Sequence, residues 1–158
     1  MTAAQNLLDL YRARLGREIA VGSWTLMDQD RIDRFAAVTG DEQWIHVDPP
    51  RAAAESPLGT TIAHGFLTLS LLPMLTGSNS PDYFAAEYPG MRRRLNYGLN
   101  RVRFPAPVRA GARIRARTAV QEARTVGEGV EIVYLFTIDI EGEEKPACIA
   151  EQIFRLYP

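Results

Sequence analysis

Cysteine, lysine and histidine are all scarce in this chain of 158 residues. There is one cysteine, Cys148, and there are two histidines, His46 and His64. A single cysteine excludes an internal disulfide and a thiolate metal cluster within one chain. Cys148 lies in an apolar, strand-like run, which favours a small core residue over a nucleophile. Lys145 is the only lysine among the eighteen Lys and Arg residues.

Signals of several other function classes are also missing. The formal net charge of −1 gives no bulk attraction to nucleic acid or to anionic membranes, so we expect neither as a partner. Residues 1–20 lack the long apolar segment of a signal peptide or membrane span, which predicts a cytoplasmic protein. The chain has no glycine-rich phosphate loop, nucleophile elbow or dinucleotide fingerprint. We therefore expect no cofactor.

The length is typical of one domain with a sizeable core, and we predict a single domain over residues 1–158. Residues 1–16 read as an N-terminal helical extension, and Ser23–Leu26 reads as a brief strand. A helix is predicted between its N-cap Asp28 and a left-handed stop at Gly40. After a polar loop over residues 77–92, alternating patterns and tight connections predict four antiparallel strands at residues 94–104, 112–124, 130–141 and 147–157.

Residues 65–75 are apolar almost all round, and a helix of that kind is buried on every face. Pro73 should terminate or kink this helix near its end. The combination predicts an α+β fold in which a curved antiparallel sheet wraps around a central apolar helix.

The segment between Arg92 and Arg124 is rich in arginine, with Glu122 as its only acid. If the hairpin closes around residues 125–129, Arg115 falls near Asp139 and Arg113 near Glu141. These pairs, and Arg117 beside them, then lie on a solvated face. Arginines with no obvious acidic partner remain candidates for contacts with ligand phosphates; they are Arg92, Arg93, Arg94, Arg101 and Arg103.

Asp41 and His46 form the first candidate catalytic pair. They lie five residues apart in a segment that is too rich in proline and charge for a regular helix, and an irregular chain lets both side chains converge. A carboxylate and an imidazole can hold one water molecule between them and exchange protons with it. The alternative is that the two residues only cap a helix or form a salt bridge.

His64-Gly65 follows and precedes the apolar helix. A helix that begins at Gly65 leaves its first N–H groups unpaired at the positive end of its dipole, which suits an oxyanion. Glycine also permits close approach of a carbonyl group. The alternatives are that Gly65 only begins a packed helix and that His64 only braces the loop. The Asp and His residues here could also supply metal ligands, but no spacing among them is diagnostic for zinc, and we expect no metal site.

These residues resemble a known family. The segments FAAVTGDEQWIHVDP and TIAHGFLTLSLLP resemble the MaoC-like (R)-specific enoyl-CoA hydratases, and within them the group named after nodulation protein N. The later strand pattern, which includes NRVRFPAPVRAGARIRA, is similar too, so that the resemblance spans nearly the whole chain. It implies a hotdog fold in which residues 65–75 form the central helix.

The resemblance also implies a function. Asp41 and His46 fall on the family's catalytic pair, Gly65 on the residue whose N–H holds the thioester carbonyl, and His64 beside it in a supporting, substrate-binding position. The implied activity is a hydro-lyase that interconverts trans-2-enoyl and (R)-3-hydroxyacyl thioesters of CoA or of acyl carrier protein. The implied assembly is a homodimer whose sheets join edge to edge, with acyl-CoA entering near the interface.

Two departures from the family concern the substrate pocket. Many members have Asn-Pro between the acid and the histidine, where this chain has Gln43-Trp44-Ile45. Some carry a serine near the helix end, where this chain has Pro73. Two other functions stay open on the sequence, namely a hotdog thioesterase and a non-catalytic binder of acyl thioesters.

Overall fold

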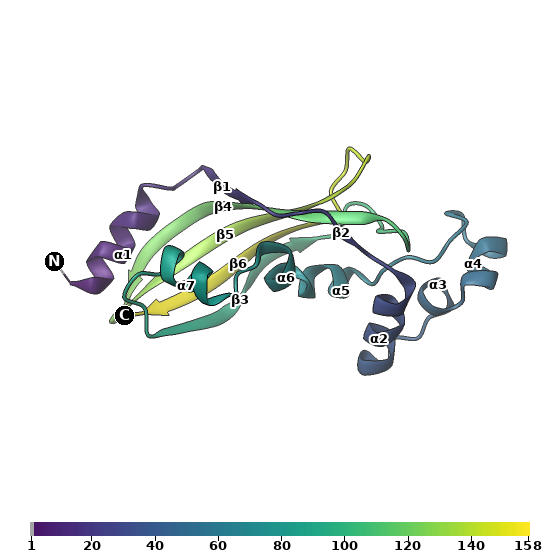
Figure 1. Ribbon diagram of the computed structural model, residues 1–158, viewed down its shortest axis with the longest axis horizontal. Coiled ribbons are helices and arrows are strands. Elements are labelled where there is room, and N and C mark those ends of the chain that lie inside the picture. Colours follow the sequence, from purple (N-terminus) through teal and green to yellow (C-terminus); the bar gives the residue numbers. More distant parts are fainter. Residues whose placement is uncertain (1) are drawn as a thin grey trace.

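One curved antiparallel sheet forms the framework of the protein. Figure 1 shows the computed structural model, which describes residues 2–158. The strand order is β1-β4-β5-β6-β3, each strand antiparallel to its neighbours, and β2 also pairs with β4. The predicted sheet is confirmed, although the sequence pattern does not predict β1. The strands are β1 (Glu18–Val21), β2 (Thr25–Leu26), β3 (Arg93–Arg103), β4 (Arg113–Val126), β5 (Gly129–Ile140) and β6 (Cys148–Tyr157).

Along the chain, α1 precedes the first strand, and the other helices of the described residues lie between β2 and β3. The helix predicted after Asp28 is confirmed as α2, since the Asp28 carboxylate accepts a 2.9 Å bond from the Arg31 N–H. Gly40 ends α2 in the left-handed conformation, with φ of 76°. The helices are α1 (Ala3–Arg12), α2 (Gln29–Thr39), α3 (Trp44–Val47), α4 (Pro49–Glu55), α5 (Gly65–Ser70), α6 (Leu72–Thr76) and α7 (Pro81–Glu87).

Two segments predicted to be irregular contain short helices, so that prediction was wrong; the sequence pattern allows one helical turn at residues 51–55, but not all of α4, nor α3 or α7. The segment around His46 forms α3 and then α4, and the segment over residues 77–92 contains α7. Proline misleads here because it suits the first turn of a helix, where its missing N–H would be unpaired anyway. Asp48 caps α4 immediately before Pro49, and Ser80 caps α7 immediately before Pro81.

The predicted central helix is present but divided. The chain pivots at Leu71 between α5 and α6, because Pro73 has no N–H to continue the α-helical ladder. Burial on every face is also wrong: Phe66 is 70% exposed and Met74 is 47% exposed. The buried face of the two helices consists of Leu67, Thr68, Leu72 and Leu75. Figure 1 shows α5 and α6 running along the sheet.

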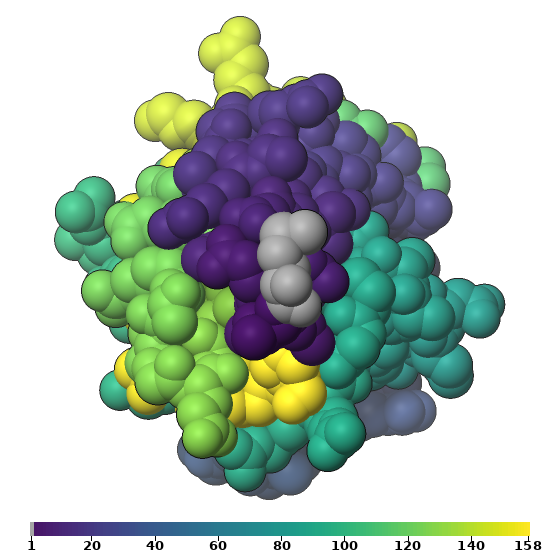
Figure 2. Space-filling model, turned by 90° about the vertical axis from the view of Figure 1, so that its left-hand side faces the viewer, coloured from purple at the N-terminus to yellow at the C-terminus, as the bar shows by residue number. Residues whose placement is uncertain are grey.

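The N-terminal helix α1 is part of the hydrophobic core. It buries Leu7, Leu8 and Tyr11 and contacts β4 and β5. Arg14 forms an ion pair with Glu87, which ties α1 to α7. Figure 2 views this end of the molecule, with α1 in purple between the green segments of the β4–β5 hairpin and the teal segments that include α7. No helix of residues 2–158 is long and apolar enough to cross a membrane.

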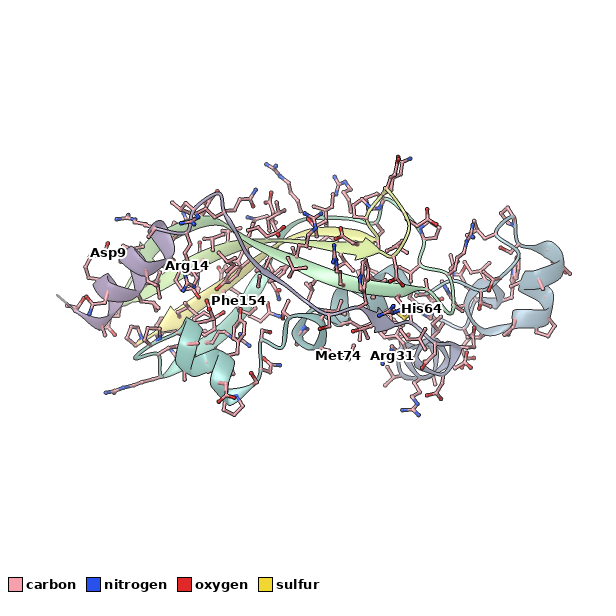
Figure 3. The ribbon with its side chains drawn as sticks, turned by 45° about the horizontal axis from the view of Figure 1, so that its top comes forward. Asp9, Arg14, Arg31, His64, Met74 and Phe154 are labelled. Atoms are coloured by element: carbon pink, nitrogen blue, oxygen red, sulfur yellow. The ribbon has the colours of Figure 1, made fainter. Side chains whose placement is uncertain are left out.

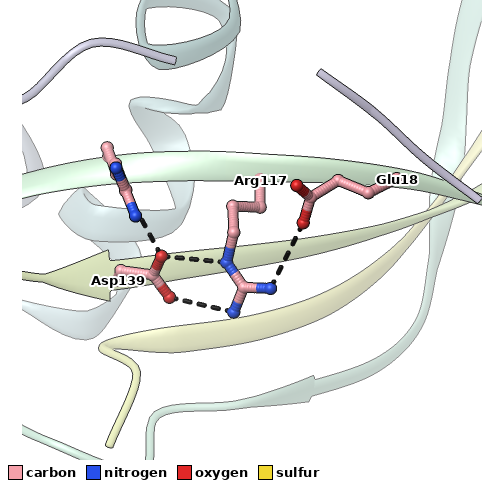
Figure 4. Close-up of polar contacts among 4 residues, drawn as sticks. Glu18, Arg117 and Asp139 are labelled. Carbon is pink, nitrogen blue, oxygen red and sulfur yellow. Dashed lines mark hydrogen bonds and ion pairs between the residues drawn. The ribbon is translucent and has the colours of Figure 1, made fainter. Parts of the chain in front are cut away.

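The predicted cross-strand ion pairs of the β4–β5 hairpin are confirmed. Arg113 lies 3.1 Å from Glu141, and Arg115 lies 3.5 Å from Asp139. Arg117 bonds both oxygens of Asp139, at 2.9 and 3.1 Å, and reaches Glu18 of β1 at 3.4 Å (Figure 4). These arginines are therefore committed to the solvated face of the sheet.

A second ion-pair cluster is centred on Glu131 of β5, which is only 2% exposed. Its carboxylate accepts hydrogen bonds from Arg124 of β4 at 2.9 Å and from Arg155 of β6 at 2.8 Å. Burial alone would raise the pKa of the Glu131 carboxyl. The bonds from Arg155 and Arg124 outweigh burial and hold this pKa below its ordinary value of 4.5.

We predict that Glu131→Gln lowers the free energy of unfolding by about 1.5–3 kcal/mol near neutral pH, because the neutral amide can accept from only one of the two arginines and turns its NH2 group toward the other. A carboxyl with a depressed pKa stabilises the fold above its unfolded-state pKa, and the benefit is lost as pH falls through its folded-state pKa. The difference between wild type and variant should therefore shrink as pH falls below 4.5. Urea denaturation over a pH series measures it, with exposed Glu128→Gln as the control. A difference that stays constant with pH would contradict this explanation.

Candidate active site

Asp41 is placed by the end of α2. Gly40 donates its N–H to the Ala36 carbonyl at 2.8 Å and turns the chain, so that Asp41 follows directly on a rigid helix. The Asp41 side chain is partly exposed, and Oδ1 accepts a hydrogen bond from Gln43 Nε2 at 3.3 Å. The carboxylate is thus held at a fixed end of the helix, with one oxygen only weakly engaged.

His46 is placed by α3 and by the segment that leads to α5. Its ring Nδ1 lies 2.7 Å from the carbonyl oxygen of Ile62, and the Ile62 N–H bonds the carbonyl of Ile45 at 3.0 Å. Gln29 of α2 adds a second support, because its Nε2 donates to the His46 carbonyl at 2.7 Å and its Oε1 accepts from the Thr61 hydroxyl. Sequence reasoning did not identify Gln29, since nothing in its local pattern indicates contacts that distant in the chain.

His64 contacts both members of the candidate pair. Its Nε2 lies 2.9 Å from the main-chain carbonyl oxygen of Asp41, and its ring stacks on His46 with centroids 3.8 Å apart. The ring of Phe35 from α2 lies 5.0 Å away. His64 is buried, and its Nδ1 has no hydrogen-bond partner. Figure 3 labels His64, Arg31 of α2 and Met74 of α6 in the part of the molecule that lies away from α1.

The two carbonyl contacts determine where the ring hydrogens are. A carbonyl oxygen only accepts, so His46 must carry its hydrogen on Nδ1 and His64 must carry its hydrogen on Nε2. The opposite nitrogens, Nε2 of His46 and Nδ1 of His64, are then free to act as acceptors. The two stacked rings therefore hold opposite tautomers, fixed by the main chain.

Gly65 begins α5 directly after His64, and its N–H belongs to the first turn, which has no partners inside the helix. A Cβ at this position would lie 2.9 Å from two carbons of the Phe104 ring. From the sequence alone, glycine is expected here because it permits close approach of a carbonyl group. The structure adds packing of Phe104 as a second reason for it.

A cavity of about 280 Å³ joins these elements. His46, Gly65, Thr68 and Phe104 line it together with apolar residues near the start of β4 and β6. Asp41 and His64 are not among its lining residues, but the His64 ring stacks on His46, and an Asp41 carboxylate oxygen lies within 4.8 Å of a His46 ring nitrogen. The cavity is thus mainly apolar, with an imidazole and a helix start as its polar groups.

The side chains of Asp41, His46 and His64 also have the composition of a metal-ligand set. One ligand atom of each lies within 4.8 Å of the others, and the carbonyl contacts leave one nitrogen free on each ring. Zinc bonds of about 2.0–2.2 Å require ligand atoms about 3.3 Å apart, so the set would have to contract to hold the ion. The expectation of no metal stays a prediction.

Neither Trp44 nor Pro73, which belong to the two departures from the family pattern, lines this cavity. The Arg51 guanidinium of α4 lies over the Trp44 ring, with its Cζ 4.5 Å from the ring centroid, and Trp44 does not line the cavity. Pro73 does line cavity space, but farther along the central helix. The two departures therefore affect different parts of the molecule.

Comparison with known proteins places the chain in a family. A sequence model described as a MaoC like domain matches residues 11–137. The chain belongs to the MaoC-like domain family. It is 44% identical over 156 residues to 3-hydroxyacyl-thioester dehydratase Z of Mycobacterium tuberculosis, covering 98% of each chain. It is 45% identical to nodulation protein N of Rhizobium leguminosarum bv. viciae, over 89% of this chain and 85% of that protein.

The fold agrees with solved structures. The R-hydratase PhaJ1 of Pseudomonas aeruginosa superposes with a TM-score of 0.67 at 22% identity, over 90% of this chain and 81% of that one. The predicted hotdog fold and the resemblance to MaoC-like and nodulation protein N sequences are confirmed. The predicted enzyme class, a hydro-lyase, is confirmed at the level of the relatives' names.

We predict that the hydrogen bond from His64 to Asp41 supports the site measurably. His64→Gln keeps an amide donor near the position of Nε2, whereas His64→Leu has none, and both lose the stacking on His46. The Gln variant should therefore be more stable than the Leu variant by about 0.5–1.5 kcal/mol in urea denaturation. Equal stability of the two variants would show that the Asp41 carbonyl does not depend on His64.

Proposed function

We propose that the protein catalyses the reversible hydration of trans-2-enoyl thioesters, of CoA or of acyl carrier protein, to (R)-3-hydroxyacyl thioesters. One observation carries the proposal: a ring nitrogen of His46 and a carboxylate oxygen of Asp41 lie within 4.8 Å of each other, and His46 shares an apolar cavity with the Gly65 helix start. A water-activating pair beside an oxyanion site is what addition of water to an α,β-unsaturated thioester requires.

Gly65 polarises the substrate in this mechanism. Its N–H donates to the thioester carbonyl oxygen, which draws electrons from the conjugated double bond and makes C3 electrophilic. Negative charge grows on that oxygen as the enolate forms, so the bond strengthens in the transition state and favours it over the ground state.

Asp41 and His46 handle the water. The Asp41 carboxylate takes one proton from a water molecule. His46 Nε2 accepts a hydrogen bond from the other O–H of that water, which stays intact, and so orients the oxygen toward C3. The oxygen bonds to C3, and a proton from the Asp41–His46 pair is delivered to C2. One water is thereby added across the double bond, and the enzyme returns to its starting protonation.

The relatives support this reaction class. One carries the name of a 3-hydroxyacyl-thioester dehydratase, which is the same reaction in the direction of water loss, and a structural neighbour is named an R-hydratase. A hotdog thioesterase would cleave the C–S bond instead, and a non-catalytic binder would do neither. We further propose that residues 1–158 act as one domain in the cytoplasm.

We predict that Asp41→Asn and His46→Gln each lower kcat/KM by about 10²–10⁴-fold, because each removes a proton acceptor from the water. Loss of enoyl-thioester absorbance with crotonyl-CoA and longer enoyl-CoAs measures the rate. Glu42→Gln, an exposed neighbour, is the matched control and should keep full activity. Dialysis against EDTA should leave the rate unchanged, since no metal takes part in the proposed steps.

Variants as active as wild type would refute the assignment of the pair. Release of free thiol at the rate of enoyl loss would identify a thioesterase. Tight binding of acyl-CoA without turnover at any chain length would identify a binding protein. Loss of activity in EDTA that zinc restores would make Asp41, His46 and His64 a metal centre.

The outer strand of the sheet carries a proposed dimer contact. β3 pairs only with β6 among the described residues, so its other edge presents unpaired N–H and C=O groups over eleven residues. Leu95, Tyr97 and Leu99 of this strand are exposed. A long apolar edge is a template for strand pairing. We propose that two copies join edge to edge along β3, with Phe104 placing the cavity near the interface.

We predict a particle of about 35 kDa, twice the 17.6 kDa chain, in light scattering. The double variant Leu95→Glu/Leu99→Glu should sediment as a monomer, because like charges would face each other across the edge. Val38→Glu is the matched control: Val38 lies on α2, is 82% exposed, and should not affect the dimer. A wild-type monomer, or equal effects of the two substitutions, would contradict the β3 contact.

A further inference from the structure

A second cavity, of about 170 Å³, lies at the other end of the central helix, between α6, α7 and the sheet. Pro73 and Thr76 of α6 line it, as do Tyr88 after α7 and Arg94 of β3. A space of about 210 Å³ lies between the two ends, beside Leu69 of α5 and Leu72 of α6. The hollows thus follow the central helix in order, from Gly65 to Thr76.

Arg94 is the only charged residue that lines the second cavity. Its guanidinium lies 4.7 Å from the Phe84 ring and 4.8 Å from the Phe154 ring, and Nη1 donates to the Ser78 carbonyl at 3.1 Å. No Asp or Glu side chain of residues 2–158 forms an ion pair with it. Figure 3 labels Phe154, which lies nearer the N-terminal helix than His64 does.

The neighbouring tyrosines do not neutralise Arg94. Tyr11 donates its hydroxyl hydrogen to the Glu87 carbonyl and accepts that of Tyr134 at 2.8 Å, so Tyr88 must donate to Tyr134 at 3.1 Å. Burial raises the pKa of Tyr134 and of Tyr11 well above the ordinary value, so these phenols stay neutral. The Arg94 cation therefore faces the cavity without a counter-ion from the protein.

The amides of Asn96 and Gln152 add further polar groups to the lining. Gln152 Nε2 donates to Asn96 Oδ1 at 3.0 Å, which leaves the Asn96 amide hydrogens available. Leu72, Pro73, Phe136 and Phe154 form the apolar side of this cavity, and its other lining residues apart from Arg94 carry hydroxyl or amide groups. A cavity with an apolar side next to a guanidinium and an amide donor is suited to the end of a hydrocarbon chain that carries an anionic group.

We propose that the second cavity binds a terminal carboxylate on the acyl chain, so that the preferred substrates are ω-carboxyacyl thioesters. This inference rests on the proposed hydratase function for its reaction but not for its binding site. Residues 65 and 76 are eleven steps apart, which is at most about 16 Å along the two successive helices. An extended chain advances about 1.2 Å per bond, so roughly a dozen bonds separate the thioester from Arg94.

The kinetic test compares two substrates that differ only at the far end: trans-2-dodecenoyl-CoA and its analogue with a carboxylate at C12. Wild type should show at least a tenfold higher kcat/KM for the carboxylated chain. Arg94→Met should reduce that ratio at least tenfold. Arg93→Met is the matched control, because Arg93 is exposed against Tyr157 and does not line the cavity. With five-carbon chains, which are too short to reach Arg94, the ratio should not depend on residue 94.

A binding test separates this inference from the proposed function. Calorimetry with the saturated, unreactive dodecanoyl-CoA and its ω-carboxy analogue needs no turnover. Tighter binding of the analogue to wild type, lost in Arg94→Met and retained in part in Arg94→Lys, would support the cavity even if no thioester is hydrated. Equal affinity of the two ligands, or a preference that survives in a folded Arg94→Met variant, would overturn the inference while the hydratase assignment stands.

Discussion

Two main-chain carbonyl groups determine the chemistry available at the candidate site. The Ile62 carbonyl holds the hydrogen of His46 on Nδ1, and the Asp41 carbonyl holds the hydrogen of His64 on Nε2. The stacked rings therefore present different free nitrogens, and only His46 lines the cavity. This geometry depends on the fold. Gly40 ends α2, which places Asp41 directly after the helix, and Gln29 ties α2 to α3 and to Thr61.

The local sequence was enough to predict much of this arrangement. Asp28 and Gly40 fix both ends of α2, and the tight turn between β4 and β5 sets the register that pairs Arg115 with Asp139. The segments that contain Asp41, His46 and His64-Gly65 carry the family resemblance, and they predict the candidate site. These features depend on neighbours in sequence or on one tight turn, which is why the sequence alone could predict them.

What the sequence could not predict depends on distant contacts. The tautomer of His64 is set by a residue twenty-three positions away, and the Gly65 backbone packs against Phe104 from the far end of β3. Exposure of Phe66 contradicts its apolar surroundings in sequence, because the sheet covers only one face of the divided helix. Arg94, whose sequence surroundings are basic, finds aromatic rings from α7 and β6 rather than an acid.

The central helix separates two tasks along its length. Its start at Gly65 lies with His46, where water addition is proposed, and its end at Thr76 lies with Arg94, where the far end of a substrate would be recognised. The helix is divided at Leu71, and Leu72, Pro73 and Thr76 of its second half line that second cavity. Reaction type and chain preference can therefore vary independently in this fold.

The opposite tautomers of the two histidines are the central claim, and long-range ¹H–¹⁵N NMR of the imidazole rings tests it most directly. We predict a hydrogen on Nδ1 of His46 and on Nε2 of His64 in the neutral rings. Single His→Gln variants assign the ring signals to the two residues. The same tautomer on both rings, or rapid exchange between tautomers at His46, would contradict it, because Nε2 of His46 would then not be reserved for the water.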